Sequence, residues 1–325
     1  YWDAHIPTWT ELLQKNGYHT MLFPRRTEVM LRHIKGMNEV YKPGPTGLVY
    51  TIDNAIKTLG KLPQDRPFCA YLYAPDPHHP YEPHADFNFG SSTTDRYDGD
   101  VAFVDHHFGR LFDWLDSTGR LKNTMIVFMA DHGESLGERL VHLHSTQLYN
   151  EQTHIPMIVF IPGVGPRRVP NYVSSVDLGP TILNAAGLDY PSECAGVSLL
   201  PLARGKSFQH PPLYGEQTMA EDSPYVMPSQ GINPVSKKYM VITQDGFKLI
   251  YDRDFYCFEL YDLRQDPGEF HNLYDQMPDR DEVMKQLLGR YIDVVQVSRP
   301  EDADELEYSE VFMRTHKGVH PESKY

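Results

Sequence analysis

Met-Ile-Val-Phe-Met-Ala-Asp-His-Gly-Glu, residues 125–134, is the stretch that decides the fold of this chain. Its first six residues are apolar and do not alternate with polar ones, which predicts a strand buried on both faces. Such a strand is typical of the centre of a parallel sheet flanked by helices. Asp131 and His132 follow at its carboxyl end, where open α/β sheets bind their ligands.

A carboxylate beside an imidazole suits a divalent metal, because it offers one anionic oxygen and one nitrogen. Asp131 and His132 are therefore candidate metal ligands. The alternative for an Asp-His-Gly triplet is a turn from strand to loop, in which the Asp side chain bonds nearby backbone.

Further apolar segments place this strand in an alternating series of helices and strands. Helices are predicted at 8–17, where Thr8 and Glu11 form a capping box, at 51–62 and at 97–115. Strands are predicted after the first two of them, at 18–23 and 68–74. This order predicts an α/β fold with a doubly wound, mostly parallel sheet flanked by helices. A strand at 156–161 and a helix at 178–186, with Asp177 as its N-cap, continue the series.

The residue composition of the sequence changes at about residue 205. A hairpin is predicted from 240 to 251 with Asp245-Gly246 at its turn, followed by a strand at 258–263 and a closing helix at 281–295. These elements predict a small C-terminal α+β subdomain with antiparallel strands. We therefore divide the chain into an α/β core, 1–205, and a C-terminal subdomain with an irregular tail, 206–325.

Composition excludes several functions. The 325 residues carry a net charge of −14, which argues against a nucleic-acid or anionic-membrane surface, because polyanions attract clustered Lys and Arg. No apolar run approaches the roughly 20 residues of a membrane span. Three scattered cysteines form neither a disulfide framework nor a zinc-finger spacing, and they do not indicate a compartment. Nothing in the sequence indicates an oligomeric state.

Six patches in fixed order resemble the sulfatase family of the alkaline-phosphatase-like superfamily. They lie at 17–20, Gly-Tyr-His-Thr; 76–81, Asp-Pro-His-His-Pro-Tyr; 127–138, which contains Asp-His-Gly-Glu; 144–156, which begins His-Ser-Thr; 175–187, which begins Ser-Val-Asp-Leu-Gly-Pro-Thr; and 260–273, which begins Leu-Tyr-Asp-Leu. Together they are spread in order across the chain from residue 8 to about 275.

The resemblance implies hydrolysis of a sulfate ester at one divalent cation, with Ca²⁺ favoured and Mn²⁺ or Mg²⁺ as alternatives. Asp131 and His132 match two of the family's four protein ligands. His78 matches the family's sulfate-binding or leaving-group histidine. His144 stands where the family has a His or Lys that contacts the sulfate and can protonate the leaving alkoxide. An unperturbed imidazole pKa of about 6.5 suits that acid role. The alternative for each is a loop histidine bonded to backbone.

The basic pair Arg25-Arg26 follows the strand at 18–23. Arg26 is a candidate sulfate contact, because a guanidinium pairs well with an anionic oxygen group. A solvated loop is the alternative reading of this segment.

Two features of the family are absent from the 325 residues. No Cys/Ser-x-Pro/Ala-x-Arg motif, whose first residue becomes the formylglycine nucleophile, occurs around Cys69, Cys194 or Cys257, and the paired aspartates that complete the metal site are missing. We therefore expect that the core is N-terminally incomplete and that this chain alone is inactive.

The implied partner is a sulfated small molecule or sulfated glycan, and the implied location is outside the cytosol, in a periplasmic, extracellular or lumenal space. Two alternatives remain open at this point. One is a phosphate or phosphonate ester hydrolase of the same superfamily, and the other is a catalytically inactive binding protein with the same fold.

Overall fold

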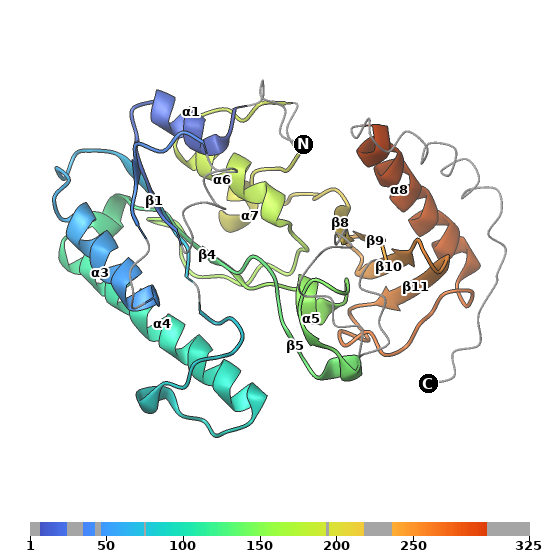
Figure 1. Cartoon of the computed structure of the whole chain (residues 1–325). Helices are drawn as coiled ribbons and strands as arrows, with labels where there is room; N and C mark the ends of the chain where they lie inside the picture. Colours follow the sequence, from blue (N-terminus) through green and yellow to red (C-terminus); the bar gives the residue numbers. More distant parts are fainter. Residues whose placement is uncertain are drawn as a thin grey trace.

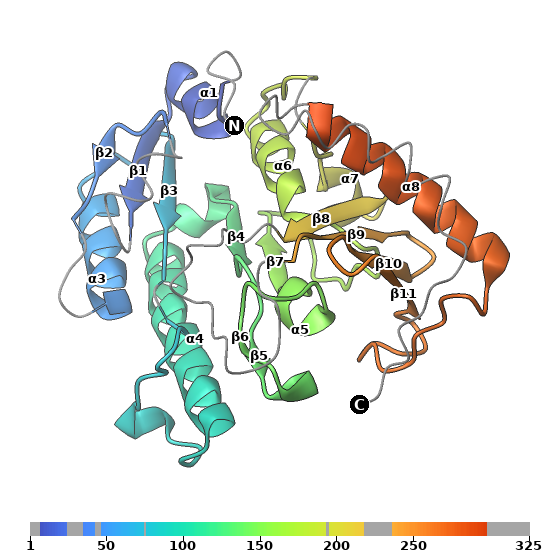
Figure 2. The ribbon, with the colours of Figure 1, turned by 45° about the vertical axis from the view of Figure 1, so that its right-hand side comes forward.

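The computed structural model describes residues 7–24, 35–42, 47–74, 76–192, 195–217 and 236–297. An α/β part and a C-terminal sheet covered by one long helix lie side by side (Figure 1). The segment of short elements from β5 to α5 lies between them at one end of the molecule (Figure 2). None of the helices described is long and apolar enough to cross a membrane.

The α/β part contains a three-stranded parallel sheet in the order β2-β1-β3. Its strands are β1 (His19–Phe23), β2 (Glu39–Val40) and β3 (Phe68–Leu72). Helix α1 (Trp9–Lys15) precedes β1 and begins with the predicted capping box, because the Thr8 and Glu11 side chains each bond the other's backbone N–H. Helix α3 (Gly47–Leu59) packs one apolar face on the sheet.

Helix α4 (Thr93–Ser117) leads to the strand that the sequence singled out, β4 (Ile126–Met129). The prediction that 125–130 is buried on both faces is wrong, because every residue of this stretch is only partly buried. Strand β4 pairs antiparallel with β7 (Met157–Phe160), and no described strand pairs with its other edge. The physical reason is a cavity between β3 and β4, which takes the place of a neighbouring strand.

The C-terminal part is a four-stranded antiparallel sheet in the order β11-β10-β9-β8. Its strands are β8 (Leu213–Gln217), β9 (Lys238–Ile242), β10 (Phe247–Asp252) and β11 (Cys257–Asp262). The predicted Asp245-Gly246 turn joins β9 to β10, and Gly246 has a φ of 88° that favours glycine. Helix α8 (Pro278–Val297) covers one face through Met284, Leu288 and Ile292.

These two parts confirm the predicted fold class, an α/β core with a parallel sheet and a C-terminal antiparallel sheet with a closing helix. The division at residue 205 stays a prediction. The remaining short elements are η1 (Ala85–Phe87), η2 (Arg120–Asn123), β5 (Ser135–Leu136), η3 (Glu138–Leu140), β6 (His142–Leu143), α5 (Asn150–Thr153), η4 (Ser175–Asp177), α6 (Leu178–Ala185) and α7 (Leu200–Ala203).

Asp177 is the N-cap residue of α6, as the sequence predicted, but its side chain makes no capping hydrogen bond to that helix. Its carboxylate instead accepts from the backbone N–H of Ser174 and of Val197, and from Nε2–H of the buried His210. The other ring nitrogen of His210, Nδ1, lies 2.8 Å from the carbonyl oxygen of Pro211, so both ring nitrogens have a partner. Asp177 therefore holds the segments after α6 and α7 in place.

Candidate active site

The candidate site begins where β3 and β4 end. Their arrows point in the same direction, so their carboxyl ends lie at the same edge (Figure 2). Tyr73 follows β3, and its hydroxyl donates to Asp131 Oδ2 after β4 over 3.1 Å. Asp131 Oδ1 accepts from the backbone N–H of His132 at 3.1 Å, so the turn interaction weighed as an alternative is present as well. The Asp131 side chain remains 59% exposed and open to a ligand.

His132 is held in one tautomer. Its Nδ1 lies 2.9 Å from the carbonyl oxygen of Gly133. A carbonyl oxygen can only accept, so Nδ1 carries the proton and Nε2 keeps a lone pair in the neutral ring. That Nε2 lies 3.7 Å from Asp131 Oδ1, and the two candidate ligand atoms therefore face the same space.

His144 stacks on His132, with ring centroids 3.9 Å apart and planes at 27°. Its Nδ1 lies 3.1 Å from Glu134 Oε1, and this contact fixes the orientation of the ring. Leu143 and Ser145 on either side have φ values of 70° and 68°, which non-glycine residues adopt rarely and at some cost. The loop is thus bent around His144 so that its ring reaches the end of β4.

His78 completes a group of three imidazoles. Its ring meets that of His144 edge to face, with centroids 5.6 Å apart. Its Nδ1 donates to the carbonyl of His79 over 2.8 Å. Each of the three rings therefore binds protein through Nδ1, which leaves Nε2 for a ligand. This array can bind the oxygens of an anion and can supply a proton.

Gly133 allows this arrangement through a close approach of two backbones. A Cβ at Gly133 would overlap the carbonyl oxygen of Glu151, and the Gly133 N–H donates to the carbonyl of Gln152 over 2.8 Å. The buried Gln152 side chain in turn bonds Ser135 Oγ and the backbone N–H groups of Thr146 and Gln147. The segment after β4 and the loop after His144 are thereby fixed to one another.

Sequence reasoning missed Glu134, Tyr73 and Tyr81. Glu134 has a side chain only 5% exposed, and it binds both His144 and the Tyr81 hydroxyl. Burial, and next the Glu134 charge, raise the pKa of Tyr81 above its ordinary value, so its hydroxyl remains a donor. The signal was present for two of them, because Glu134 directly follows the Asp-His-Gly triplet and Tyr81 closes the loop that carries His78.

Asp131 and His132 fit a metal only as part of a ligand set. The Nδ1–H bond of His132 to a carbonyl is the support that metal-bound histidines usually have. Calcium, however, takes six to eight oxygen ligands. Within the described ranges, no group of three or more His, Cys, Asp or Glu side chains could hold an ion.

The structure therefore brings Asp131, His132, His144 and His78 together, and their chemical roles stay predictions. Arg26, the candidate sulfate contact, and its neighbour Arg25 lie outside the described residues.

Comparisons with known proteins agree with the order of the motifs. The family model described as "Sulfatase" matches residues 4–188, and the model described as "N-sulphoglucosamine sulphohydrolase, C-terminal" matches residues 142–297. Arylsulfatase K of Xenopus laevis is 30% identical over 199 residues, which are 61% of this chain and 36% of that protein. The chain thus spans about a third of the length of this curated relative.

Solved structures share the fold at low sequence identity. One, described as in complex with its substrate D-glucosamine-2-N,6-O-disulfate, has a TM-score of 0.73 and 19% identity over 94% of this chain and 85% of that one. The phosphonate monoester hydrolase of Agrobacterium radiobacter has a TM-score of 0.69 and 17% identity over 88% of this chain and 80% of that one.

Proposed function

This chain belongs to the sulfatase family, and from that premise we propose that it is a sulfuric ester hydrolase. The observation that carries the proposal is the group of three imidazoles beside Asp131, each with Nδ1 bonded to protein and Nε2 left for a ligand. In a chain with a net charge of −14, His78 and His144 can receive an anionic ester when their rings carry a second proton, because Nε2 then donates to an ester oxygen.

In this proposal His78 and His144 bind the sulfate oxygens, and His144 protonates the leaving alkoxide through Nε2. Glu134 positions His144 by accepting from Nδ1 over 3.1 Å, and it stabilises the charged ring. Tyr81 positions Glu134 from the other side. Protonation of the leaving oxygen avoids the release of a free alkoxide, which is a poor leaving group in water.

We also propose that Asp131 and His132 contribute to a divalent cation site, with Ca²⁺ favoured over Mn²⁺ or Mg²⁺. When bound, such an ion would act as a Lewis acid toward an ester oxygen. The bond from Tyr73 keeps Asp131 at the site, and the Gly133 carbonyl keeps Nε2 of His132 directed toward it.

Residues 1–325 contain no Cys/Ser-x-Pro/Ala-x-Arg motif, the source of the formylglycine nucleophile in the family. We therefore propose that this chain binds sulfate esters but does not turn them over alone. Detectable hydrolysis of an aryl sulfate by the 325-residue chain, lost in Asp131→Ala, would overturn this part.

The proposed substrate class is a sulfated sugar, alone or in a glycan, and the proposed location is outside the cytosol. One solved relative is described in complex with its substrate D-glucosamine-2-N,6-O-disulfate, and that sulfated sugar supports the class. The similar fold of a phosphonate monoester hydrolase makes phosphonate esters the second candidate, because both anions present oxygens to the same kind of site.

Isothermal titration calorimetry with D-glucosamine-2-N,6-O-disulfate, in the presence of calcium, tests the proposal. The chain should bind this ligand and not unsulfated glucosamine. His144→Ala should weaken binding by about tenfold to a hundredfold, the value of a hydrogen bond to a charged group.

His271→Ala is the matched control and should change nothing, because that side chain is 82% exposed in the C-terminal part. Equal binding of unsulfated glucosamine, or an unchanged affinity in His144→Ala, contradicts the proposal. Tighter binding of a phenylphosphonate monoester favours the second candidate.

A further inference from the structure

The loop between β3 and α4 carries two residues of the candidate site, His78 and Tyr81. The backbone N–H of Tyr81 donates to the carbonyl of His78 over 3.1 Å, so the two residues belong to one turn. Tyr81 has a φ of 57°, a value that non-glycine residues adopt at some cost. The turn therefore needs contacts from outside the loop to keep its shape and place.

Helix α4 supplies such contacts along its first turns. The Tyr81 ring meets that of Tyr97 edge to face, with centroids 5.5 Å apart. Further along the loop, the Phe87 ring meets that of Phe103 with centroids 6.1 Å apart. A Cβ at Gly99 would lie only 2.6 Å from the carbonyl oxygen of Phe87, so the helix and η1 approach one another closely. The loop thus lies along the helix.

A hydrogen-bonded pair joins the loop to the helix between these aromatic contacts. His84 Nε2 of the loop lies 2.6 Å from Asp100 Oδ1 of α4, and the two side chains are 18% and 1% exposed. The His84 ring also stacks on Phe103, with centroids 3.7 Å apart and planes at 3°. Burial raises the pKa of Asp100 above its ordinary value, and the hydrogen bond from His84 opposes that effect. The two contacts together fix the place and the orientation of the His84 ring.

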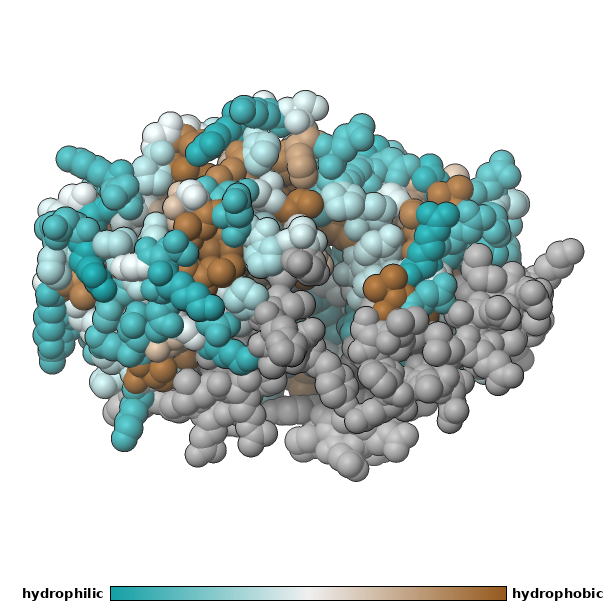
Figure 3. Space-filling view, turned by 90° about the horizontal axis from the view of Figure 1, so that it is seen from above, coloured by the Kyte–Doolittle hydropathy of each residue, from teal (hydrophilic) through white to brown (hydrophobic). Residues whose placement is uncertain are grey.

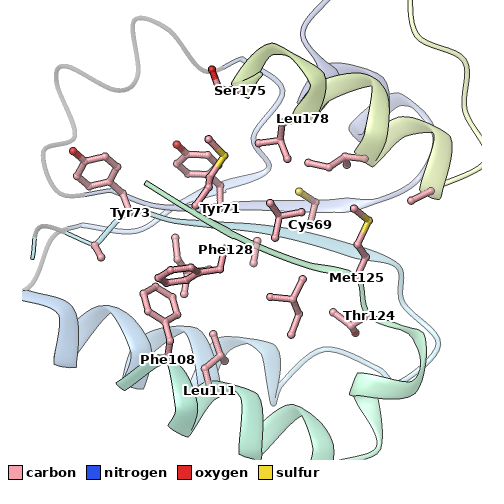
Figure 4. A pocket seen from close by; sticks show the side chains of 18 of the residues that line it. Cys69, Tyr71, Tyr73, Phe108, Leu111, Thr124, Met125, Phe128, Ser175 and Leu178 are labelled. Carbon is pink, nitrogen blue, oxygen red and sulfur yellow. The ribbon is translucent and has the colours of Figure 1, made fainter. Parts of the chain in front are cut away.

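Helix α4 is itself fixed to the strand that ends at the site. Phe108, about two turns beyond Asp100, meets Phe128 of β4 edge to face with ring centroids 5.4 Å apart (Figure 4). Phe128 stands three residues before Asp131. A loop that is held against α4 is therefore also held at a fixed place relative to the end of β4.

We propose that His84 and Asp100 are positioning residues of the candidate site. Their hydrogen bond holds the turn that carries His78 and Tyr81, and so keeps the His78 ring 5.6 Å from that of His144. This inference rests on the proposed function, because it gives the pair a part in binding the sulfate ester.

The contact between His78 and His144 needs a support on each side, because it joins two separate loops. Gln152 supplies one of them, since its side chain binds the backbone of the loop after His144. The pair of His84 and Asp100 supplies the other. Loss of the pair should therefore displace His78 and leave distant parts of the chain unchanged.

NMR of the unliganded chain, labelled with ¹⁵N in its histidines, reads this displacement directly. His84→Ala should shift the ring signals of His78 and leave those of His210, which is buried beside Asp177, where they are. Asp100→Asn replaces the carboxylate by a neutral amide of the same size and should shift the His78 signals as well. His84→Gln keeps an N–H donor near the place of Nε2, so it should return the His78 signals toward their wild-type positions.

Calorimetry with D-glucosamine-2-N,6-O-disulfate and calcium provides the second measurement. His84→Ala should weaken binding by about tenfold, the lower end of the value of a hydrogen bond to a charged group, and His84→Gln by less than about threefold.

His19→Ala is the matched control and should change neither the His78 signals nor the binding. Its Nε2 lies 2.8 Å from Glu39 Oε1, and its side chain is 18% exposed, as that of His84 is. It begins β1 next to α1, at the end of the molecule that faces the viewer in Figure 3. The loop between β3 and α4 lies at the opposite end (Figure 1).

Ring signals of His78 that stay unchanged in both His84→Ala and Asp100→Asn overturn the proposal. So does equal weakening of binding in His84→Ala and His84→Gln, because the hydrogen bond then has no part in it. A shift at His210 as large as that at His78 also overturns it, because the pair then stabilises the fold as a whole. A wild-type chain that does not bind the sugar refutes the proposed function instead, and the His78 signals of the unliganded variants still test the positioning.

Discussion

The ion pair between Lys248 and Glu269 joins the candidate site to the C-terminal sheet. Lys248 Nζ lies 2.7 Å from Glu269 Oε1, and both side chains are 0% exposed. Lys248 also donates to Asn150 Oδ1 and Thr153 Oγ1 in α5, and Glu269 Oε2 accepts from the backbone N–H of Asn150. Burial lowers the pKa of Lys248, and Glu269 opposes that effect. The pair therefore holds α5 against β10.

Glu269→Gln removes the charge that compensates a fully buried ammonium group. Breaking one partner of such a pair costs about 3–5 kcal/mol, because the remaining charge is buried alone. Lys248→Met leaves a buried carboxylate and should cost a similar amount. The double variant leaves no uncompensated charge, so it should lose at least about 2 kcal/mol less than the sum of the two single variants.

Urea unfolding followed by far-UV circular dichroism measures these differences in the free energy of unfolding. Glu282→Gln is the matched control, because Glu282 forms a surface pair with Lys285 at 3.5 Å and is 56% exposed. It should cost less than about 1 kcal/mol. A loss of less than about 1 kcal/mol in Glu269→Gln as well would refute this reasoning. So would a double variant whose loss equals the sum of the losses of the two single variants.

Three further predictions concern the loop after β4, the site and helix α1. Gly133→Ala should cost more than about 2 kcal/mol in urea unfolding, because its Cβ would overlap the Glu151 carbonyl. Its control, Gly109→Ala in α4, should stabilise the chain by about 0.5–1 kcal/mol, because nothing lies within 4 Å of the added Cβ. Tyr81→Phe should weaken binding of the disulfated glucosamine about three- to tenfold in calorimetry, because Glu134 loses a donor, and unchanged binding would contradict that role. The backbone N–H of Thr8 lowers the pKa of Glu11 below its ordinary value. The Glu11 carboxylate therefore stabilises the folded state above about pH 4.5, and this stabilisation is lost as pH falls through the lower pKa of the folded state. In acid unfolding, Glu11→Gln should lose less free energy of unfolding than wild type between about pH 6 and pH 3.

Local patterns predicted local structure well. The capping box of Thr8 and Glu11, the Asp245-Gly246 turn and the amphipathic run of α4 each depend on a few neighbouring residues. The start of α4 was missed by four residues, because a second capping box, Ser92 with Asp95, was not recognised. In such cases the physical determinants all lie within one turn of the chain.

What the sequence could not supply depends on distant partners. Asp177 has the pattern of an N-cap, but Val197 and His210 bind its carboxylate from other segments. The apolar run before Asp131 predicts burial, yet burial depends on which strand lies beside it. The gathering of His78, His132 and His144 followed from the order of the family motifs. Glu134 stands directly after the Asp-His-Gly triplet, but its contact with His144 is seen only in the structure.

The central claim is that the Nε2 atoms of His78 and His144 receive the oxygens of a sulfate ester. A titration of histidine-¹⁵N-labelled chain with D-glucosamine-2-N,6-O-disulfate, followed by NMR of the ring nitrogens, tests it most directly. The account predicts that the Nε2 signals of these two rings shift as ligand is added and reach a plateau when the site is saturated. The Nε2 signal of His271 should not shift. Ring signals that stay unchanged at His78 and His144, or shift equally at His271, would contradict it.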